Sequence, residues 1–158
     1  MIPAMDVNNI NPFLQSSISI VESVTQMKLT VGKPAKTDFH IQDKTYAIQV
    51  GVVGAMKGQV VLALKEPYAK EVASKMMFGM PVNELDEMAS SALNELSNMI
   101  MGNTATIFST LGTLIDITPP LAVYGENLQL KKDIDGLKVT LIYDGKDYIN
   151  LYICVYKE

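Results

Sequence analysis

A helical repeat of apolar residues runs through the middle of the chain, and it limits the possible folds more than any other feature. The apolar positions between about Asn83 and Leu111 are Leu85, Met88, Ala89, Ala92, Leu93, Leu96, Met99, Ile100, Ile107 and Leu111. They follow the period of 3.6 residues over about seven turns, so one side of a long helix must be covered. Gly112 stands where a C-terminal cap is expected.

Segments with strand-like alternation lie on both sides of this predicted helix. They cover residues 38–41, 45–53 and 59–64 before it, with a turn at 55–58, and 114–117, 121–124, 128–131, 137–143 and 148–156 after it. Asp144-Gly145 predicts a tight hairpin between the last two. In the final strand, Ile149, Leu151, Ile153 and Val155 predict a core face, whereas Tyr148, Asn150, Tyr152, Cys154 and Tyr156 are expected to border solvent or another subunit.

Two shorter helices complete the pattern. One is expected from about Asn8 to Met27, with Asn11 and Pro12 at its N-cap and first turn, and the other begins at Pro67. Helices followed by strands therefore occur twice, with a division near Pro81. We predict an α+β fold of two pseudo-duplicated halves, in which long helices pack on one face of an antiparallel-rich sheet. The length of 158 residues fits one domain spanning 1–158.

Composition argues against several classes of partner and location. There is no arginine, the usual residue for recognising phosphate and guanine, and the net charge is −4, so nucleic acid is not an expected partner. No apolar run approaches the roughly 18 residues that span a bilayer, and the N-terminus lacks signal-peptide features. The single cysteine, Cys154, cannot form an internal disulfide. We expect a soluble cytoplasmic protein with no membrane partner.

Conventional catalytic and metal-binding patterns have little support. His40 is the only histidine and has no second histidine or cysteine near it in sequence. No serine or cysteine has a convincing base partner, and no glycine-rich phosphate loop occurs.

A polar stripe on the long helix is the strongest candidate site. Ser91, Glu95, Asn98 and Gly102 recur at i, i+4, i+7 and i+11, roughly 130° from the centre of the apolar stripe. A carboxylate only accepts hydrogen bonds, whereas an amide donates and accepts. Gly102 costs about 1 kcal/mol in a helix interior, which is easier to understand if a partner's backbone comes close. By spacing alone, however, an ordinary solvated helix face is the commoner explanation.

Several segments resemble the CheX branch of the CheC/CheX/FliY phosphatase family of bacterial chemotaxis. They are Ile10-Asn11-Pro12-Phe13, Gly58-Gln59-Val60-Val61, Asn83-Glu84-Leu85-Asp86-Glu87-Met88, residues 94–103 and Thr118-Pro119-Pro120. The specific part is E-x-x-N, here Glu95 and Asn98, followed by Gly102-Asn103. Asn103 itself falls on the apolar side and is expected to bond to sheet or loop backbone.

The resemblance implies that the chain removes the aspartyl phosphate from a CheY-type response regulator. Glu95 would anchor the enzyme by pairing with a lysine of the regulator's active site, and Asn98 would orient the attacking water. The required Mg²⁺ would belong to the regulator, so no cofactor or metal is expected on this chain. CheX-type proteins resemble homodimers joined through their sheets, which predicts a homodimer with one site in each subunit.

Two other interpretations compete with the enzyme. One is a non-catalytic module of the same fold that binds a response regulator or resembles the middle domain of flagellar switch proteins. The other is an unrelated α/β domain. The presence of both Glu95 and Asn98 favours the enzyme, because a docking face alone has no need of the amide.

Overall fold

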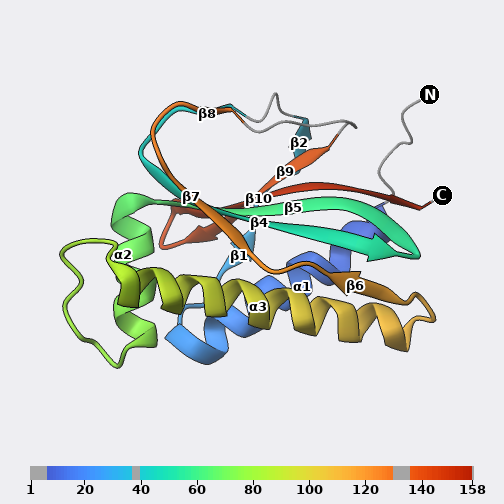
Figure 1. Cartoon of the computed structure of the whole chain (residues 1–158), viewed down its shortest axis with the longest axis horizontal. Helices are drawn as coiled ribbons and strands as arrows, with labels where there is room; N and C mark the ends of the chain where they lie inside the picture. The colour runs from blue at the N-terminus through green and yellow to red at the C-terminus, as the bar shows by residue number, and fades with distance from the viewer. Residues whose placement is uncertain (1–6, 37–39, 130–135, 158) are drawn as a thin grey trace.

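The computed structural model describes residues 7–36, 40–129 and 136–157 (Figure 1). Within these ranges there are three helices, α1 (Val7–Thr25), α2 (Glu66–Met76) and α3 (Glu87–Thr110). The described strands are β1 (Thr30–Val31), β2 (Ala35–Lys36), β3 (His40–Ile41), β4 (Thr45–Gly54), β5 (Met56–Lys65), β6 (Ile115–Ile117), β7 (Leu121–Gly125), β8 (Leu128–Gln129), β9 (Leu137–Tyr143) and β10 (Lys146–Lys157). None of the described helices is long and apolar enough to cross a bilayer.

Eight of these strands form one antiparallel sheet with the order β1-β9-β10-β5-β4-β6, in which β2 also pairs with β9 and β7 also pairs with β4. β3 and β8 form a separate two-stranded ribbon. Helices α1 and α3 lie side by side under one face of the sheet, and α2 stands at one end (Figure 1). The predicted α+β arrangement, with long helices on one face of an antiparallel sheet, is confirmed.

The pseudo-duplication is visible in the strand pairing. Exchanging β1–β5 with β6–β10 leaves the sheet order unchanged: β5 and β10 pair at the centre, β4 and β9 flank them, and β1 and β6 occupy the two edges. The same exchange converts the β2–β9 pair into the β7–β4 pair and returns the β3–β8 ribbon to itself. Each half therefore contributes its first short strands to the other half's hairpin.

Side chains are buried on both faces of the central strands. The larger cluster lies between the helices and the sheet, where the Phe13 and Phe108 rings meet edge to face at 5.5 Å between centroids. The smaller cluster, on the opposite face, consists of Ile41, Ala47, Val61, Ala63, Tyr152 and Cys154, with Leu128 packed against it. Because Ile41 and Leu128 come from the β3–β8 ribbon, Tyr152 and Cys154 are buried within the chain. The prediction that they border solvent or another subunit is wrong.

Three predicted boundaries are also wrong. Pro12 lies inside α1, which already includes Val7, and its ring is buried; it is not in the first turn, and Asn11 is not an N-cap. Helix α3 begins at Glu87, not near Asn83, because Asp86 caps it. Residues 56–58 belong to β5. Gly58, at φ +145°, lies where a Cβ would be 1.8 Å from the Cys154 backbone oxygen, so this glycine permits close strand pairing and does not form a turn.

Three residues lie on faces other than those predicted. Met88 is 59% and Leu111 is 67% exposed. Met88 lies at the edge of the apolar stripe next to the polar one, and Leu111 is the C-cap residue after the last turn of α3. The pairing register of β9 and β10 shifts between Asp147 and Ile149. This bulge turns Tyr148 to the helix side together with Ile149, where the Tyr148 ring stacks on Tyr68.

The Asp144-Gly145 hairpin is present, and both residues have positive φ.

Candidate functional site

Helix α3 carries the candidate residues, and both of its ends are capped. The Asp86 carboxylate accepts a hydrogen bond of 2.9 Å from the Ala89 backbone N–H, which satisfies one of the free donors of the first turn. Leu111 closes the other end, followed by Gly112 at φ +82°. The buried face consists of Ala89, Leu93, Leu96, Ser97, Ile100, Met101, Thr104 and Phe108. This face determines which residues of α3 are left for solvent.

The polar stripe is exposed as the sequence predicts. Ser91, Glu95 and Asn98 are exposed, and Gly102 is half-buried. Neither the Glu95 carboxylate nor the Asn98 amide forms a hydrogen bond or ion pair with another residue in the described part of the chain. Both groups are therefore available to a partner.

Gly102 has no role in packing that the structure reveals. A Cβ placed there would have nothing within 4 Å outside the backbone of its own helix. Alanine would therefore fit without strain and would favour the helix. The glycine is not explained by contacts inside this chain.

Two hydrogen bonds on either side of the Glu95–Asn98 pair hold α3 against its neighbours. The hydroxyl of buried Tyr46, on β4, donates to Asn94 Oδ1 at 2.9 Å. Asn103 Nδ2 donates to Ser16 Oγ of α1 at 2.7 Å, so its partner is a side chain and not the predicted backbone group. Asn94 was not singled out by the sequence analysis, because nothing in its spacing distinguishes it from a solvated polar residue. Together these bonds hold the stripe to the sheet and to α1.

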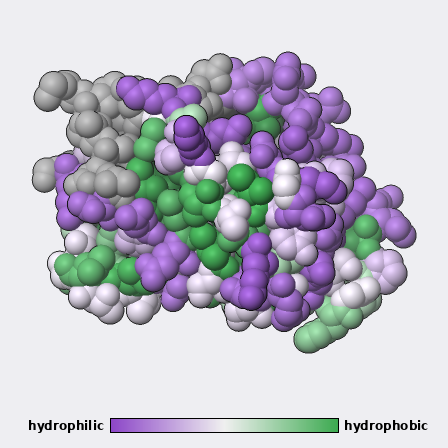
Figure 2. Space-filling view, turned by 180° about the vertical axis from the view of Figure 1, so that it is seen from behind, coloured by the Kyte–Doolittle hydropathy of each residue, from purple (hydrophilic) through white to green (hydrophobic). Residues whose placement is uncertain are grey.

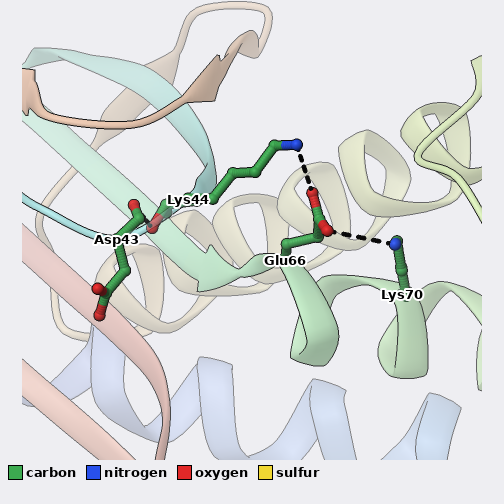
Figure 3. Close-up of polar contacts among 5 residues, drawn as sticks. Asp43, Lys44, Glu66 and Lys70 are labelled. Carbon is green, nitrogen blue, oxygen red and sulfur yellow. Dashed lines mark hydrogen bonds and ion pairs between the residues drawn. The ribbon is translucent and has the colours of Figure 1, made fainter.

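A second polar cluster lies at the start of α2 (Figure 3). The Glu66 carboxylate is 3.2 Å from Lys44 Nζ and 3.3 Å from Lys70 Nζ, and its backbone N–H donates to the Lys44 carbonyl at 2.9 Å. Partial burial raises the pKa of the Glu66 carboxyl, but the hydrogen bonds and charges of Lys44 and Lys70 outweigh it and hold the pKa below its usual value. All three side chains are engaged, which identifies this cluster as a structural contact between α2 and the loop before β4.

The described residues include no group of three or more histidines, cysteines, aspartates or glutamates that could hold a metal ion. The segment of sequence that contains α3 carries charge of one sign. Residues 76–129 contain six acidic residues, Glu84, Asp86, Glu87, Glu95, Asp116 and Glu126, and no lysine, arginine or histidine. All six are exposed. The sequence alone contains this signal, but the prediction that nucleic acid is not a partner used only the net charge of the whole chain.

Comparison with known proteins identifies the same family as the sequence motifs. The family model described as chemotaxis phosphatase CheX matches residues 46–142, more than half of the chain. The chain belongs to the CheX family. A curated relative, the CheY-P phosphatase CheX of Thermotoga maritima, is 32% identical over 152 residues, which cover 96% of this chain and 97% of the relative.

Solved structures agree with this membership. The CheX–CheY–BeF3–Mg²⁺ complex from Borrelia burgdorferi contains a chain that is 28% identical, with a TM-score of 0.79 and coverage of 94% of this chain and 97% of that one. A CheC-like protein from Shewanella sp. PV-4 is 27% identical, with a TM-score of 0.83 and coverage of 96% and 99%. The predicted resemblance to the CheX branch is confirmed, and the fold is shared over nearly the whole chain.

Proposed function

We propose that this CheX-family chain is a phosphatase that removes the phosphoryl group from the aspartyl phosphate of a CheY-type response regulator. The observation that carries the proposal is the pair of exposed, unengaged side chains, Glu95 and Asn98, on a capped helix that the core and two hydrogen bonds hold in place. The relationship to a CheY-P phosphatase supplies the substrate class. We also propose residues 1–158 as one phosphatase domain.

Glu95 is assigned the anchoring role. Its carboxylate can only accept hydrogen bonds or form an ion pair, so it suits a lysine at the rim of the regulator's active site. It projects from the same side of α3 as Asn98, about one turn away along the axis. Binding through Glu95 would therefore bring the Asn98 amide to the phosphoryl group.

Asn98 is assigned the role of orienting the attacking water. Its amide can accept a hydrogen bond from the water and donate one toward a phosphoryl oxygen. The water oxygen attacks phosphorus in line with the aspartyl oxygen, the P–O bond to that oxygen breaks, and the products are inorganic phosphate and the free carboxylate. Phosphoryl transfer depends mainly on positioning and charge stabilisation, so one rigid amide is a sufficient contribution. An aspartate at this position would repel the phosphoryl group.

Mg²⁺ is proposed to arrive with the regulator and not to bind this chain. The composition of the Borrelia burgdorferi complex, CheX with CheY, BeF3 and Mg²⁺, supports a CheY-type partner and an ion that accompanies it. We further propose that the chain acts in the cytoplasm as a homodimer with one site in each subunit.

The test is the decay of a CheY-type regulator labelled with acetyl phosphate, with and without this protein. The wild-type chain should accelerate the loss of phosphate in proportion to its concentration. Glu95→Gln keeps the side-chain size but removes the charge, so it should raise KM more than it lowers kcat. Decay that stays at its spontaneous rate in saturating wild-type protein would exclude the enzyme and favour the non-catalytic binding module.

A further inference from the structure

The exposed stripe of α3 continues from Ser91 toward the N-terminus of the helix. Met88 lies three residues earlier, and Met88, Ser91, Glu95 and Asn98 fall within about 80° of one another around the helix. Met88 is about 10 Å along the axis from Glu95 and about 15 Å from Asn98. Met88 is 59% exposed, although its side chain is apolar and the other three residues of this face are polar.

The loop between α2 and α3 adds two more apolar side chains at the same end of the molecule. Phe78 is 100% exposed and Met80 is 53% exposed. Met80 and Met88 line a surface hollow of about 340 Å³, together with Met77, Val82, Glu84 and Asp86. In Figure 2 a green, apolar group projects from the lower right of the molecule, the end at which this loop lies. Phe78, Met80 and Met88 are called the apolar patch below.

The backbone holds the apolar patch in place. The Gly79 N–H donates to the Ser74 carbonyl at 2.8 Å, and the Ser74 hydroxyl donates to the Met80 carbonyl at 2.8 Å. Phe78 has φ +58°, a left-handed conformation that a bulky side chain adopts at a cost. A phenylalanine that is strained and fully exposed has no packing role in this chain. Its left-handed conformation ends α2 just after the C-cap Met77, where glycine or asparagine is the usual residue, so neither packing nor helix termination requires a phenylalanine here.

We propose that the apolar patch is the second contact surface for the phosphorylated response regulator, and that it supplies binding energy for the reaction at Asn98. This inference rests on the proposed function. A specific protein interface covers about 800 Å² of each partner, a patch roughly 30 Å across. A regulator centred on Glu95 and Asn98 would therefore also cover Met88. Exposed apolar anchors surrounded by polar residues are the usual sources of interface affinity.

Charge indicates what the partner's surface must be. Glu84 and Asp86 line the hollow beside Met80 and Met88, whereas Lys75, in the last turn of α2 and three residues before Phe78, is the nearest basic residue in sequence. The matching surface is apolar with basic residues at its edge, close to the phosphorylated aspartate. A second copy of this chain would bring like charges together, so the regulator is the better occupant.

The test measures two quantities with a CheY-type regulator from the same organism: Kd for the beryllofluoride-activated form, and KM and kcat for dephosphorylation. Met88→Ser removes apolar area, and Phe78→Asn places a residue that tolerates positive φ, so both variants should fold. Each should raise Kd and KM by about tenfold, with kcat unchanged. Leu111→Ser is the matched control, because Leu111 is 67% exposed at the other end of α3.

Met88→Glu separates an apolar contact from an electrostatic one. A glutamate at this position suits the helix N-terminus and adds attraction toward a basic partner, so binding governed by charge would tighten. The apolar contact predicts weaker binding. Tighter binding by Met88→Glu, or Kd within twofold of wild type for Met88→Ser and Phe78→Asn, would overturn the inference.

The two proposals fail separately in this experiment. If the regulator binds and the patch variants weaken binding, but the wild-type chain does not accelerate decay, the proposed function is wrong and the docking surface stands. If decay is accelerated and the patch variants behave like wild type, only the docking surface is wrong. A wild-type chain that does not bind the regulator at all excludes both.

Discussion

At the scale of single residues, Gly102 is expected to lower the stability of the chain and to favour binding of the regulator. Gly102→Ala meets no atom within 4 Å outside its own helix backbone, so it should raise the free energy of unfolding by about 1 kcal/mol. The added methyl group lies on the stripe that faces the proposed partner and should raise KM severalfold. Urea denaturation and the decay assay measure the two effects. A variant that is more stable and fully active would show that the partner does not approach this position.

Tyr148 is a second residue whose substitution should stabilise the protein. Its hydroxyl is buried and lies near the Glu71 carboxylate, without a well-formed hydrogen bond to it or to any other described residue. Tyr148→Phe should therefore raise the free energy of unfolding by about 1 kcal/mol at neutral pH, because the unsatisfied hydroxyl is removed. A loss of stability would mean that the hydroxyl has an ordered partner.

The same substitution should change the pH dependence of stability. Burial, together with the negative charge of Glu71, raises the pKa of Tyr148 above the ordinary value of 10.0. The folded state therefore holds the Tyr148 proton more tightly than the unfolded state does. This group does not lower the free energy of unfolding of the wild type below pH 10.0, but it does so increasingly as the pH rises above that value. The advantage of Tyr148→Phe over wild type should grow between about pH 10 and pH 11, by up to about 1.4 kcal/mol. An advantage that stays constant with pH would contradict the burial argument.

The side of an element to which a side chain points was predictable where the helical period determines it. It was not predictable where a β-bulge interrupts the alternation of a strand. The exposure of Glu95 and Asn98 follows from the apolar stripe on the other side of the helix. The position of Tyr148 does not follow from alternation, because one bulge between Asp147 and Ile149 reverses the face. The Tyr46–Asn94 hydrogen bond joins residues 48 apart, which no local pattern reveals.

At the scale of elements, the Glu66 cluster makes the stability of the start of α2 depend on acid. The pKa of Glu66 is lowered, so its contribution is present above the ordinary value of 4.5 and is lost as the pH falls. Glu66→Gln should lower Tm at neutral pH, and the difference from wild type should shrink as the pH falls below 4.5. The exposed Glu84→Gln is the control. A Tm difference that persists to about pH 3 would contradict this assignment.

Most elements were predictable because the helices are amphipathic and the hairpin residues have distinctive conformations. The errors lie where burial is not one-sided. Strand β4 reads as half-buried, yet its first four residues are all buried, since the β3–β8 ribbon covers the second face of the sheet. That ribbon joins segments almost 90 residues apart in sequence, and its strands are only two residues each. Such short strands have no period to detect.

At the scale of the whole molecule, the acidic segment that contains α3 predicts that association depends on salt. The six acidic residues between 76 and 129 are all exposed and have no basic residue among them in sequence. Raising the NaCl concentration from about 50 to 300 mM should increase KM roughly threefold to tenfold and leave kcat unchanged. KM that is independent of salt would show that the regulator does not use this charge.

The architecture and the family were predictable together, because the two halves repeat the same order of elements and the E-x-x-N and G-N residues lie on one helix. The apolar patch was not, since Met88 belongs to the helical apolar period and Phe78 and Met80 lie in a loop. Only the three-dimensional structure shows that all three are exposed at the end of the proposed site.

In the proposed reaction Asn98 contributes to the chemical step, whereas Glu95 contributes to binding. The most direct measurement is the decay of the phosphorylated regulator at saturating Asn98→Ala, alongside Kd for the same variant. For this variant we expect decay to return to within a few per cent of its spontaneous rate, a loss of about 100-fold or more in kcat, with Kd within about threefold of wild type. An Asn98→Ala variant that binds normally and keeps the wild-type kcat would contradict this role of Asn98.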